Sequence, residues 1–354
     1  MKVMSVVGAR PQFIKLGPLS RAIRVHCEEI VVHTGQHFDS DMSATFFKEL
    51  DLPTPDYDLN VGSGSHAVQT AAMLERLEVV MLTCTPNAVI VFGDTNTTLA
   101  AALAAAKLHI PVVHVEAGLR SFNRTMPEEI NRIVVDRCSD LLFAPTEAAY
   151  AQLVSEGLGE VSVLTGDIMA DALRENAKRA LQRSSVLERL GVEEGSYILL
   201  TLHRPYTVDD ARTLAHVLEQ MSQVGLNVLF PVHPRTRTMI DEHTIPVGSS
   251  VRCVPPQGYL DFIRIMNGAS AIVTDSGGIQ KEAYLLGRPC VTIRTETEWI
   301  ETVEAGWNLL VDPQSPDISR QIQAFKPAGP RPDVYGRSVA DKMVKHLLKL
   351  TMRS

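Results

Sequence analysis

Short runs of Val, Ile and Leu recur through the first half of the chain, and each is followed by turn residues and a longer stretch with helical spacing. The runs cover residues 3–7, 30–33, 88–92, 112–115, 141–143 and 161–164. Uninterrupted apolar runs of this length are typical of strands buried on both faces. Their alternation with helices predicts a parallel sheet with helices on both sides.

The same rhythm starts again after a charged, helical stretch near residues 171–190. Further strands are predicted at residues 198–202, 228–232, 251–254, 271–274 and 290–293. Residues 326–335, rich in Pro and Gly, are typical of a linker, and residues 338–350 have the apolar spacing of a helix. We therefore predict two Rossmann-like domains, residues 1–168 and 169–337, and a last helix over residues 338–352 that packs back on the first domain.

The length of the chain supports two domains, and the distribution of its charges limits the kinds of partner that are expected to bind. With 354 residues and 45% hydrophobic content, the chain exceeds the usual size of one domain. Its 34 Lys and Arg and 41 Asp and Glu are mixed without a basic stripe, so nucleic acid is not an expected partner. The longest apolar stretches, such as residues 100–106, are far shorter than the roughly 20 residues of a membrane helix, and the first residues lack the pattern of a signal peptide. We expect no membrane association and a cytoplasmic location.

The cysteines give no sign of a disulfide framework or of a metal site. They are Cys27, Cys84, Cys138, Cys253 and Cys290, which are odd in number, scattered and set in apolar segments without CxxC spacing. We predict that all five are thiols in the core and that the protein binds no metal.

Polar residues with reactive side chains follow many of the predicted strands. In open α/β sheets, ligands bind beyond the carboxyl ends of the strands. The residues at these ends are Arg10, Gln36, His37, Asp94, Glu116, His203, His233, Asp275 and Ser276. So many ionisable groups at strand ends indicate an active site. Each has a structural alternative, and for Asp94 it is a cap of the helix predicted over residues 95–108.

Two glycine-bearing turns are candidate anion sites. Residues 274–282, TDSGGIQKE, place two glycines at a helix start, where backbone amides and the helix dipole favour a phosphate. Glu282, one turn beyond Gly278, is placed to accept hydrogen bonds from ribose hydroxyls. The alternative is a plain turn capped by Ser276. The other turn, GARPQ at residues 8–12, carries Arg10 with Lys15 farther along, and it lacks the GxGxxG pattern of dinucleotide-binding proteins.

A third cluster combines acids with cations. Residues 116–121 and 126–132 contain Glu116, Glu128, Glu129 and Arg132. For one of Glu128 and Glu129, the alternative role is a favourable position in the first turn of a helix. Several carboxylates beside a histidine and arginines are what proton abstraction next to a phosphate leaving group requires. This composition favours elimination or transfer at an anomeric carbon.

Taken together, the motifs resemble those of the non-hydrolysing UDP-N-acetylglucosamine 2-epimerase family. The motifs are GARPQFIKLGP, TGQH, FGDTNTTLAA, HVEAGLRSF, MPEEINR, LFAPTE, LHRP, PVHP, PQGYLDF and TDSGGIQKEA, and they run from residue 1 to about residue 312. The resemblance implies an α/β fold of the GT-B type, in which two Rossmann-like domains border a central cleft and the C-terminal domain binds UDP. It also implies a homodimer, and an active site without a metal, nicotinamide or other cofactor.

The activity implied by the resemblance is inversion of carbon 2 in a UDP-linked N-acetylamino sugar. UDP leaves by anti elimination to give a 2-acetamidoglucal and then adds back, while carbon 2 is protonated on its opposite face. By motif position, the implied catalytic residues are Asp94, Glu116, Glu128 and His203. Which carboxylate removes the proton and which returns it stays open. The implied substrate-binding residues are Arg10, Lys15, Arg132, Gln257, Phe262, Ser276, Gly277, Gly278 and Glu282.

Departures from the family's motifs leave the sugar open. Where many bacterial members read HRREN and TERPE, this chain has HRPYT at residues 203–207 and TEWIE at residues 297–301. The form with Trp299 and Lys281 resembles the branch that acts on UDP-2,3-diacetamido-2,3-dideoxyglucuronate, unless Trp299 only packs in the core. We predict UDP-N-acetylglucosamine as the substrate, with the diacetamido uronate as an alternative. A GT-B glycosyltransferase is the alternative of another type.

Overall fold

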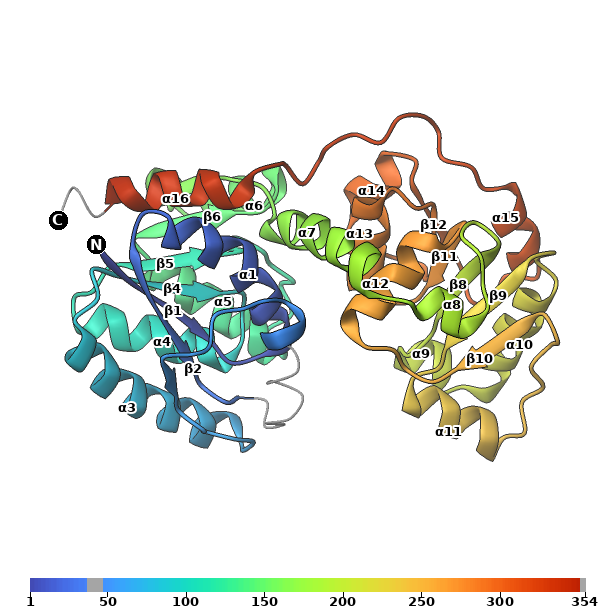
Figure 1. The fold of residues 1–354 in the computed structure, drawn as a ribbon, viewed down its shortest axis with the longest axis horizontal. Helices are drawn as coiled ribbons and strands as arrows, with labels where there is room; N and C mark the ends of the chain where they lie inside the picture. Colours follow the sequence, from blue (N-terminus) through green and yellow to red (C-terminus); the bar gives the residue numbers. More distant parts are fainter. Residues whose placement is uncertain (37–46, 351–354) are drawn as a thin grey trace. The chain divides into compact units, whose positions relative to one another are not determined.

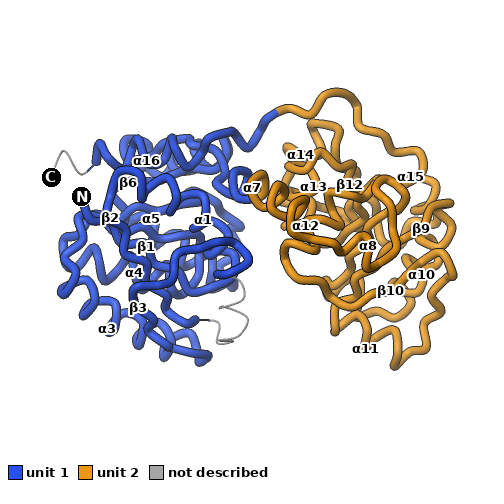
Figure 2. The backbone as a smooth tube through the Cα atoms, viewed as in Figure 1, with its two compact units in different colours: residues 1–172, 333–354 blue, residues 173–332 orange. Residues whose placement is uncertain are grey.

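The computed structural model describes residues 1–36 and 47–350 and divides into two compact units. Unit 1 comprises Met1–Ala172 with Asp333–Ser354, and unit 2 comprises Leu173–Pro332 (Figure 2). Each unit contains one parallel sheet whose strands alternate with helices along the chain (Figure 1). The α/β class predicted from the apolar runs is confirmed.

In the described part of unit 1, seven parallel strands form one sheet in the order β3-β2-β1-β4-β5-β6-β7. They are β1 (Lys2–Val7), β2 (Glu28–His33), β3 (Tyr57–Asp58), β4 (Ala88–Phe92), β5 (Val112–Val115), β6 (Leu141–Ala144) and β7 (Ser162–Leu164). The apolar runs predicted six of them, and the two-residue β3 has no such run. The strand order reverses between β1 and β4, so a ligand crevice is expected beyond the carboxyl ends of these two strands.

The helices of unit 1 connect these strands and cover the sheet. They include α1 (Arg10–Arg24), α3 (His66–Cys84), α4 (Asn96–Lys107), α5 (Pro127–Cys138), α6 (Glu147–Ser155) and α16 (Val339–Leu350), with a 3₁₀ turn η1 at Gly159–Val161. Helix α16 contacts α1 and β6. Its buried positions Val339, Met343 and Leu347 recur at helical spacing, so one apolar stripe holds this last helix on unit 1.

Unit 2 repeats the architecture with six parallel strands in the order β10-β9-β8-β11-β12-β13. The strands are β8 (Tyr197–Thr201), β9 (Asn227–Pro231), β10 (Val251–Val254), β11 (Ala271–Thr274), β12 (Cys290–Ile293) and β13 (Asn308–Val311). Their helices are α8 (Val186–Leu190), α9 (Pro205–Val208), α10 (Ala211–Ser222), α11 (Pro234–Glu242), α12 (Tyr259–Gly268), α13 (Gly277–Leu286), α14 (Ile300–Glu304) and α15 (Ile318–Ala324). Here the order reverses between β8 and β11.

The structure refines two sequence expectations and adds one strand that was missed. The charged stretch near residues 171–190 is two helices, α7 (Ile168–Arg183) and α8, separated at Ser184 and Ser185. Strand β13 was missed because its apolar part is only three residues long and half-buried. The segment over residues 326–335 has no helix or strand, but its last residue, Tyr335, is fully buried, and the Tyr335 carbonyl accepts a hydrogen bond from the Asp167 amide at 2.9 Å.

The prediction that all five cysteines lie in the core is wrong for three of them. All five thiols are free, but only Cys84 and Cys290 are buried, whereas Cys27, Cys138 and Cys253 are half-buried. The difference follows from position, because Cys27 and Cys138 lie at element ends and Cys253 lies on the edge strand β10. Burial raises the pKa of Cys290 to about 12. Within the described residues, no helix is long and apolar enough to span a membrane.

Candidate active site

Asp94 and Glu116 follow two neighbouring strands at the carboxyl edge of the unit 1 sheet. Asp94 comes two residues after β4 and Glu116 directly after β5, and these strands pair through Phe92 and Val115. Both side chains are half-buried. The structure therefore brings two of the predicted catalytic carboxylates to one edge of the sheet, beside the point where the strand order reverses.

Each of these carboxylates has a cation partner that the sequence analysis had assigned to substrate binding. The Lys15 ammonium forms an ion pair with Glu116. The Arg132 guanidinium donates from Nε and Nη2 to Asp94 Oδ2 at 2.9 and 2.7 Å. Lys15 is buried on α1, where an unpaired ammonium would be unfavourable, so the pair with Glu116 accounts for its position.

The backbone at Glu116 is strained. Its φ of +74° lies in the left-handed region, where a residue with a side chain costs on the order of 1–3 kcal/mol. The following residues hold this conformation, because the Ala117 amide donates to the Phe143 carbonyl at 3.0 Å and the Gly118 amide donates to Asp136 Oδ2 at 3.1 Å. Gly118 must be a glycine, since a Cβ there would lie 2.4 Å from the Ala149 carbonyl oxygen. Strain held this firmly at a strand end is typical of functional residues.

Asp94 does not cap the helix that follows it. Helix α4 is capped by Thr95, whose hydroxyl accepts a hydrogen bond from the Thr98 amide at 3.4 Å. Asn131 of α5 donates to the backbone carbonyl of Asp94 at 2.8 Å. The capping alternative for Asp94 is therefore wrong, and its carboxylate is directed to Arg132 instead.

The two neighbouring acids of α5 have different roles. Glu129 is buried and accepts hydrogen bonds from the Ser121 and Phe122 amides at 2.9 and 2.8 Å, from the Ser121 hydroxyl, and from Arg132 at 2.7 Å. Burial alone would raise the pKa of Glu129, but these donors together lower it. Glu128 is half-buried and faces a cavity. Glu129 is thus the structural acid and Glu128 the candidate for chemistry.

The cavity beside Asp94 and Glu128 has a volume of about 370 Å³. Its described wall is polar and contains carboxylates, amides, hydroxyls and a histidine, but neither Lys nor Arg. The lining residues are Gln36, Ser63, Gly64, His66, Gln69, Asp94, Thr95, Asn96, Pro127, Glu128 and Asn131. Such a wall suits an uncharged ligand group rich in hydroxyls or amides. His37, the neighbour of Gln36, lies outside the described residues.

His203 is the histidine at the carboxyl edge of the unit 2 sheet, where β8 ends. Its Nδ1 lies 3.3 Å from Oδ1 of the fully buried Asp275, which also accepts hydrogen bonds from the His203 and Arg204 amides. Burial lowers the pKa of His203, and Asp275 opposes this effect only in part. A neutral ring whose Nδ1–H points at Asp275 leaves Nε2 as an acceptor. The sequence analysis had noted Asp275 at a strand end without giving it this orienting role.

The glycine turn after β11 opens helix α13, as predicted, and Ser276 precedes the helix without capping it through its side chain. Ser276 is thus the N-cap residue, as in the alternative of a plain turn, but its side chain makes no capping hydrogen bond. Gly277 is buried under the Glu298 carboxylate, because a Cβ at Gly277 would lie 1.8 Å from Glu298 Oε1. A Cβ at Gly278 would meet no atom within 4 Å, so the backbone there is open to a ligand. Glu282 is half-buried one turn farther along α13.

The remaining predicted binding residues lie at helix starts or on helix surfaces. Arg10 is exposed at the start of α1, after β1. Gln257 is half-buried just before α12 and donates to the Pro255 carbonyl at 2.7 Å. Phe262 of α12 packs partly against the apolar core of unit 2. The structure thus groups Arg10, Lys15, Asp94, Glu116, Glu128 and Arg132 in unit 1, and His203, Gln257, Phe262, Ser276, Gly277, Gly278 and Glu282 in unit 2.

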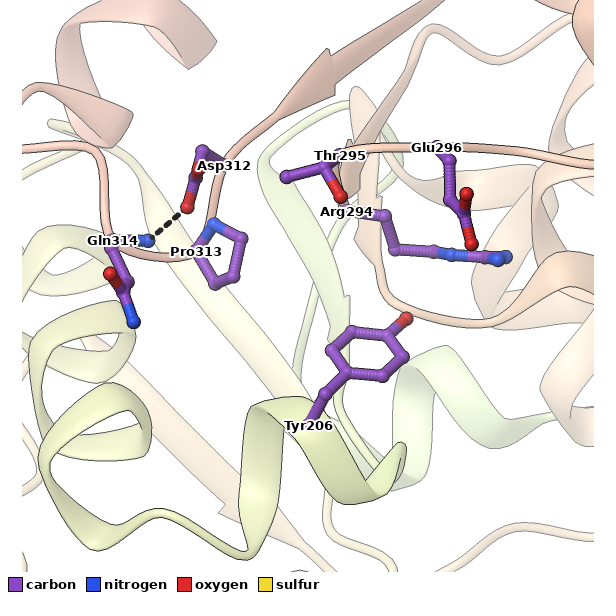
Figure 3. Close-up of a pocket in the computed structure, with 7 residues that line it drawn as sticks. All are labelled: Tyr206, Arg294, Thr295, Glu296, Asp312, Pro313 and Gln314. Atoms are coloured by element: carbon purple, nitrogen blue, oxygen red, sulfur yellow. Dashed lines mark hydrogen bonds between the residues drawn. The ribbon is translucent and has the colours of Figure 1, made fainter.

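Trp299 and Lys281, the two residues that set the motifs apart, contact each other. The Lys281 ammonium lies over the Trp299 ring, 4.3 Å from its centre. Nearby, Arg294 pairs with Glu298 at 2.7 Å. A second cavity of about 370 Å³ is lined by Arg294 with Tyr206, Thr295, Glu296, Asp312, Pro313 and Gln314, and Tyr206 rises from α9 toward the arginine (Figure 3). Arg294 is therefore paired with one acid, Glu298, and shares the wall of this cavity with two others, Glu296 and Asp312.

No cluster of histidine, cysteine and acidic side chains suited to a metal ion occurs among residues 1–36 and 47–350. The ionisable groups of the site are instead paired with one another or with backbone amides.

Comparison with known proteins identifies close relatives. Residues 21–349 match the family model described as UDP-N-acetylglucosamine 2-epimerase. A UDP-N-acetylglucosamine 2-epimerase homolog of Methanococcus maripaludis is 47% identical over 93% of each chain. The UDP-2,3-diacetamido-2,3-dideoxy-D-glucuronate 2-epimerase of Pseudomonas aeruginosa is 46% identical over 88% of each chain.

The fold is also shared with solved structures. The UDP-GlcNAc 2-epimerase of Methanocaldococcus jannaschii superposes with a TM-score of 0.91 and 38% identity, covering 99% of this chain and 100% of that one. The same enzyme in complex with UDP-GlcNAc and UDP gives a TM-score of 0.82 with 39% identity over 99% and 100% of the chains. The two α/β units therefore form a fold of the GT-B type.

The contrast between Glu128 and Glu129 predicts different effects of the same substitution. Glu129→Gln should lower the free energy of unfolding by about 2–3 kcal/mol at pH 7, because an amide cannot accept from all the donors around Glu129. Glu128→Gln should change it by less than about 0.5 kcal/mol. Since the folded pKa of Glu129 is lowered, its contribution is present above the pKa of the unfolded carboxyl and is lost as the pH falls. Urea denaturation at pH 7 and pH 4 measures both effects, and equal losses for the two variants would contradict the assignment.

Proposed function

The chain belongs to the UDP-N-acetylglucosamine 2-epimerase family, and from this premise we propose that it interconverts UDP-N-acetylglucosamine and UDP-N-acetylmannosamine. UDP would leave by anti elimination to a bound 2-acetamidoglucal and add back after carbon 2 has changed face. The observation that carries the proposal is the pair of carboxylates at the ends of β4 and β5. A cytoplasmic location stays a prediction from the sequence.

The unit 1 residues support the proton transfers. Inversion through a glucal needs one group that removes the proton from carbon 2 and another that returns a proton on the opposite face. Asp94, Glu116 and Glu128 supply three carboxyls around the ends of β4, β5 and the start of α5. Asp94 and Glu116 have separate cation partners, Arg132 and Lys15, so the two acids are held independently of each other. Two acids that are fixed by different cations are suited to act on opposite faces of carbon 2.

The unit 2 residues support the departure and return of UDP. The open backbone at Gly278 and the start of α13 favour a diphosphate. His203 stands where β8 ends and Asp275 where β11 ends, and these strands pair with each other. With Nδ1–H directed at Asp275, the neutral His203 ring has an Nε2 that can accept a proton from the phosphate oxygen of UDP as UDP adds back, and the imidazolium can return that proton as UDP leaves. We assign Glu282 to the ribose and Gln257 and Phe262 to the uracil.

Loss of a catalytic carboxylate should abolish turnover without loss of UDP binding. We expect Asp94→Asn and Glu116→Gln each to lower the epimerisation rate by about 10²-fold or more, the scale of general acid-base groups, because neither amide can take a proton. UDP affinity, measured by calorimetry, should stay within about twofold, since the proposed diphosphate residues lie in unit 2. Glu147→Gln, at an exposed position in the first turn of α6, is the matched control and should retain full activity.

The same assay in deuterated water separates the epimerase from a glycosyltransferase. Proton NMR of the UDP-sugar, without any acceptor, should show deuterium at carbon 2 as the second epimer forms, because the proton removed is not the one returned. A variant at Asp94 or Glu116 that turns over normally would falsify the role given to that residue. Epimer formation with the original hydrogen retained, or a requirement for an acceptor, would overturn the mechanism.

The surroundings of the site favour a neutral sugar over a uronate. The carboxylate of a bound uronate would need a cation, but the described wall of the cavity beside Asp94 has none. Arg294, the arginine just before the TEWIE segment, is already paired with Glu298. We expect kcat/KM for UDP-N-acetylglucosamine to exceed that for UDP-2,3-diacetamido-2,3-dideoxyglucuronate by about tenfold or more. Arg294→Gln should leave this ratio unchanged. A preference for the uronate that Arg294→Gln removes would instead assign the chain to the function of its Pseudomonas relative.

We also propose a homodimer, which the exposed face of α3 supports. Val68, Val79 and Leu82 are 66%, 61% and 61% exposed and lie on the same side of this helix. Replacing Val79 and Leu82 together with Lys should convert the dimer to a monomer in sedimentation equilibrium, because two charges would be buried in the contact. Val25→Lys, at a 75% exposed position elsewhere in unit 1, is the control. A dimer that survives the double substitution would exclude this face.

A further inference from the structure

His114 is a buried histidine of the HVEAG motif to which nothing above assigns a role. It lies on β5, two residues before Glu116, and has no solvent exposure. We propose that His114 is a positioning residue, which carries a proton on each ring nitrogen and ties the ends of β4 and β5 to α5. In this way it holds the segments that carry Asp94 and Glu116. The kinetic test rests on the proposed epimerase function, whereas the spectroscopic test does not.

The hydrogen bonds of His114 define its protonation. Nε2 lies 2.7 Å from the Gly93 carbonyl oxygen, and Nδ1 lies 2.7 Å from Asp136 Oδ1. A carbonyl oxygen only accepts, so Nε2 must donate. Nδ1 must also donate if Asp136 is ionised. The proton arrangement of His114 thus depends on the state of Asp136.

Asp136 has the surroundings of an ionised carboxylate. It is fully buried on α5, and its Oδ2 faces Arg120 Nη2 at 2.7 Å and accepts from the Gly118 amide at 3.1 Å. Burial alone would raise the pKa of Asp136, but His114 and Arg120 lower it. Apart from His114, the Arg120 guanidinium and the Gly118 amide both donate to Oδ2, and the buried positive charge of Arg120 favours the ionised carboxylate. The ring of His114 is then an imidazolium between two acceptors.

The charges around His114 balance as a chain. The Arg120 side chain is almost fully buried and donates through Nε at 2.8 Å and Nη2 at 2.9 Å to Glu156, the residue that follows α6. From β5 outward, the order is therefore His114, Asp136, Arg120 and Glu156, two positive and two negative groups. The charged groups near these strand ends also include the Lys15–Glu116 and Arg132–Asp94 pairs, Glu129, which pairs with Arg132, and Glu128.

This series of hydrogen bonds and ion pairs fixes the two segments that carry the catalytic carboxylates. Gly93, which precedes Asp94, has a φ of +64°, and its carbonyl is held by His114. Gly118, two residues after the strained Glu116, donates to the same Asp136 that His114 contacts. Asp136 also belongs to the helix that carries Glu128 and Arg132. One side chain thus links the three segments from which Asp94, Glu116 and Glu128 project.

Kinetics of His114→Gln test the positioning role. A glutamine amide cannot donate to two acceptors on opposite sides, so one segment is released. We expect kcat to fall by about 10²-fold, the scale of a displacement of about 1 Å, while KM and UDP affinity change by less than about threefold. His33→Gln, a buried histidine that ends β2 of the same sheet, is the matched control and should keep kcat within about twofold.

The pH dependence of kcat distinguishes the charged positioning role of His114 from a purely structural one, because only loss of the charge would shift it. Removal of the imidazolium leaves one net negative charge on Asp136, Arg120 and Glu156 together, so the neighbouring carboxylates should bind protons more readily and the acidic limb of kcat should move to higher pH. The double variant His114→Gln with Asp136→Asn removes one charge of each sign. Its acidic limb should return toward that of the unmodified enzyme, even if kcat stays low.

NMR of the ¹⁵N-labelled full chain tests the protonation directly. The imidazole signal that disappears in His114→Gln should show both nitrogens protonated at pH 7.5, with hydrogen-bond couplings to two acceptors. A neutral tautomer for this signal would overturn the proposal. So would a His114→Gln enzyme that folds and has the kcat and pH profile of the unmodified chain, or one whose KM rises while kcat is unchanged.

Discussion

Carboxylates at the ends of two adjacent buried strands repel each other and lose solvation by water, and much of unit 1 is arranged around this constraint. Paired strands lie about 5 Å apart, so Asp94 and Glu116 cannot be separated by distance alone. The structure gives each its own cation from a different helix, Arg132 of α5 and Lys15 of α1. Arg132 is itself held by Glu129, whose remaining lone pairs are taken by the loop over residues 121–122. Both helices thus bring a cation to an acid at this edge of the sheet.

In the proposed function, unit 2 has the opposite task, which is to bind the diphosphate at the start of α13. The carboxylate of the buried Asp275 accepts hydrogen bonds from two backbone amides and faces His203. These donors offset much of its negative charge near the start of α13. The lowered pKa of His203 keeps the ring neutral near pH 7. Its Nδ1–H then points at Asp275, and its Nε2 can accept a proton. Gly277 and Gly278 differ in what surrounds them. Gly277 lies under the Glu298 carboxylate, which leaves no room for a side chain, whereas the backbone of Gly278 is open to a ligand.

The fold and the placement of the site could largely be predicted, because both follow from local patterns. Apolar runs and turns determine strands, and parallel strands bring their following residues to one edge. Partners far apart in the sequence could not be predicted: Lys15 and Glu116 are 101 residues apart, and Asp94 and Arg132 are 38 apart. The same holds for the left-handed backbone of Glu116, for which the only local hint was the glycine two residues later. The choice between Glu128 and Glu129 depended on a loop that folds back on α5, which no periodicity reveals.

The contact between Lys281 and Trp299 bears on how substrate is inferred from motifs in this family. In the structure, the Trp299 ring lies against the ammonium of Lys281, which is nearly buried. A buried lysine is stabilised by a neighbour that covers its stem and interacts with its charge. The segment is further fixed by Gln280, which accepts hydrogen bonds from Thr297 and Asn308 at 2.6 and 3.1 Å. A motif of this kind therefore records how unit 2 is built before it records which sugar is bound. The sugar is better sought in the polar cavity beside Asp94 and Glu128, where its wall meets the proton-transfer groups.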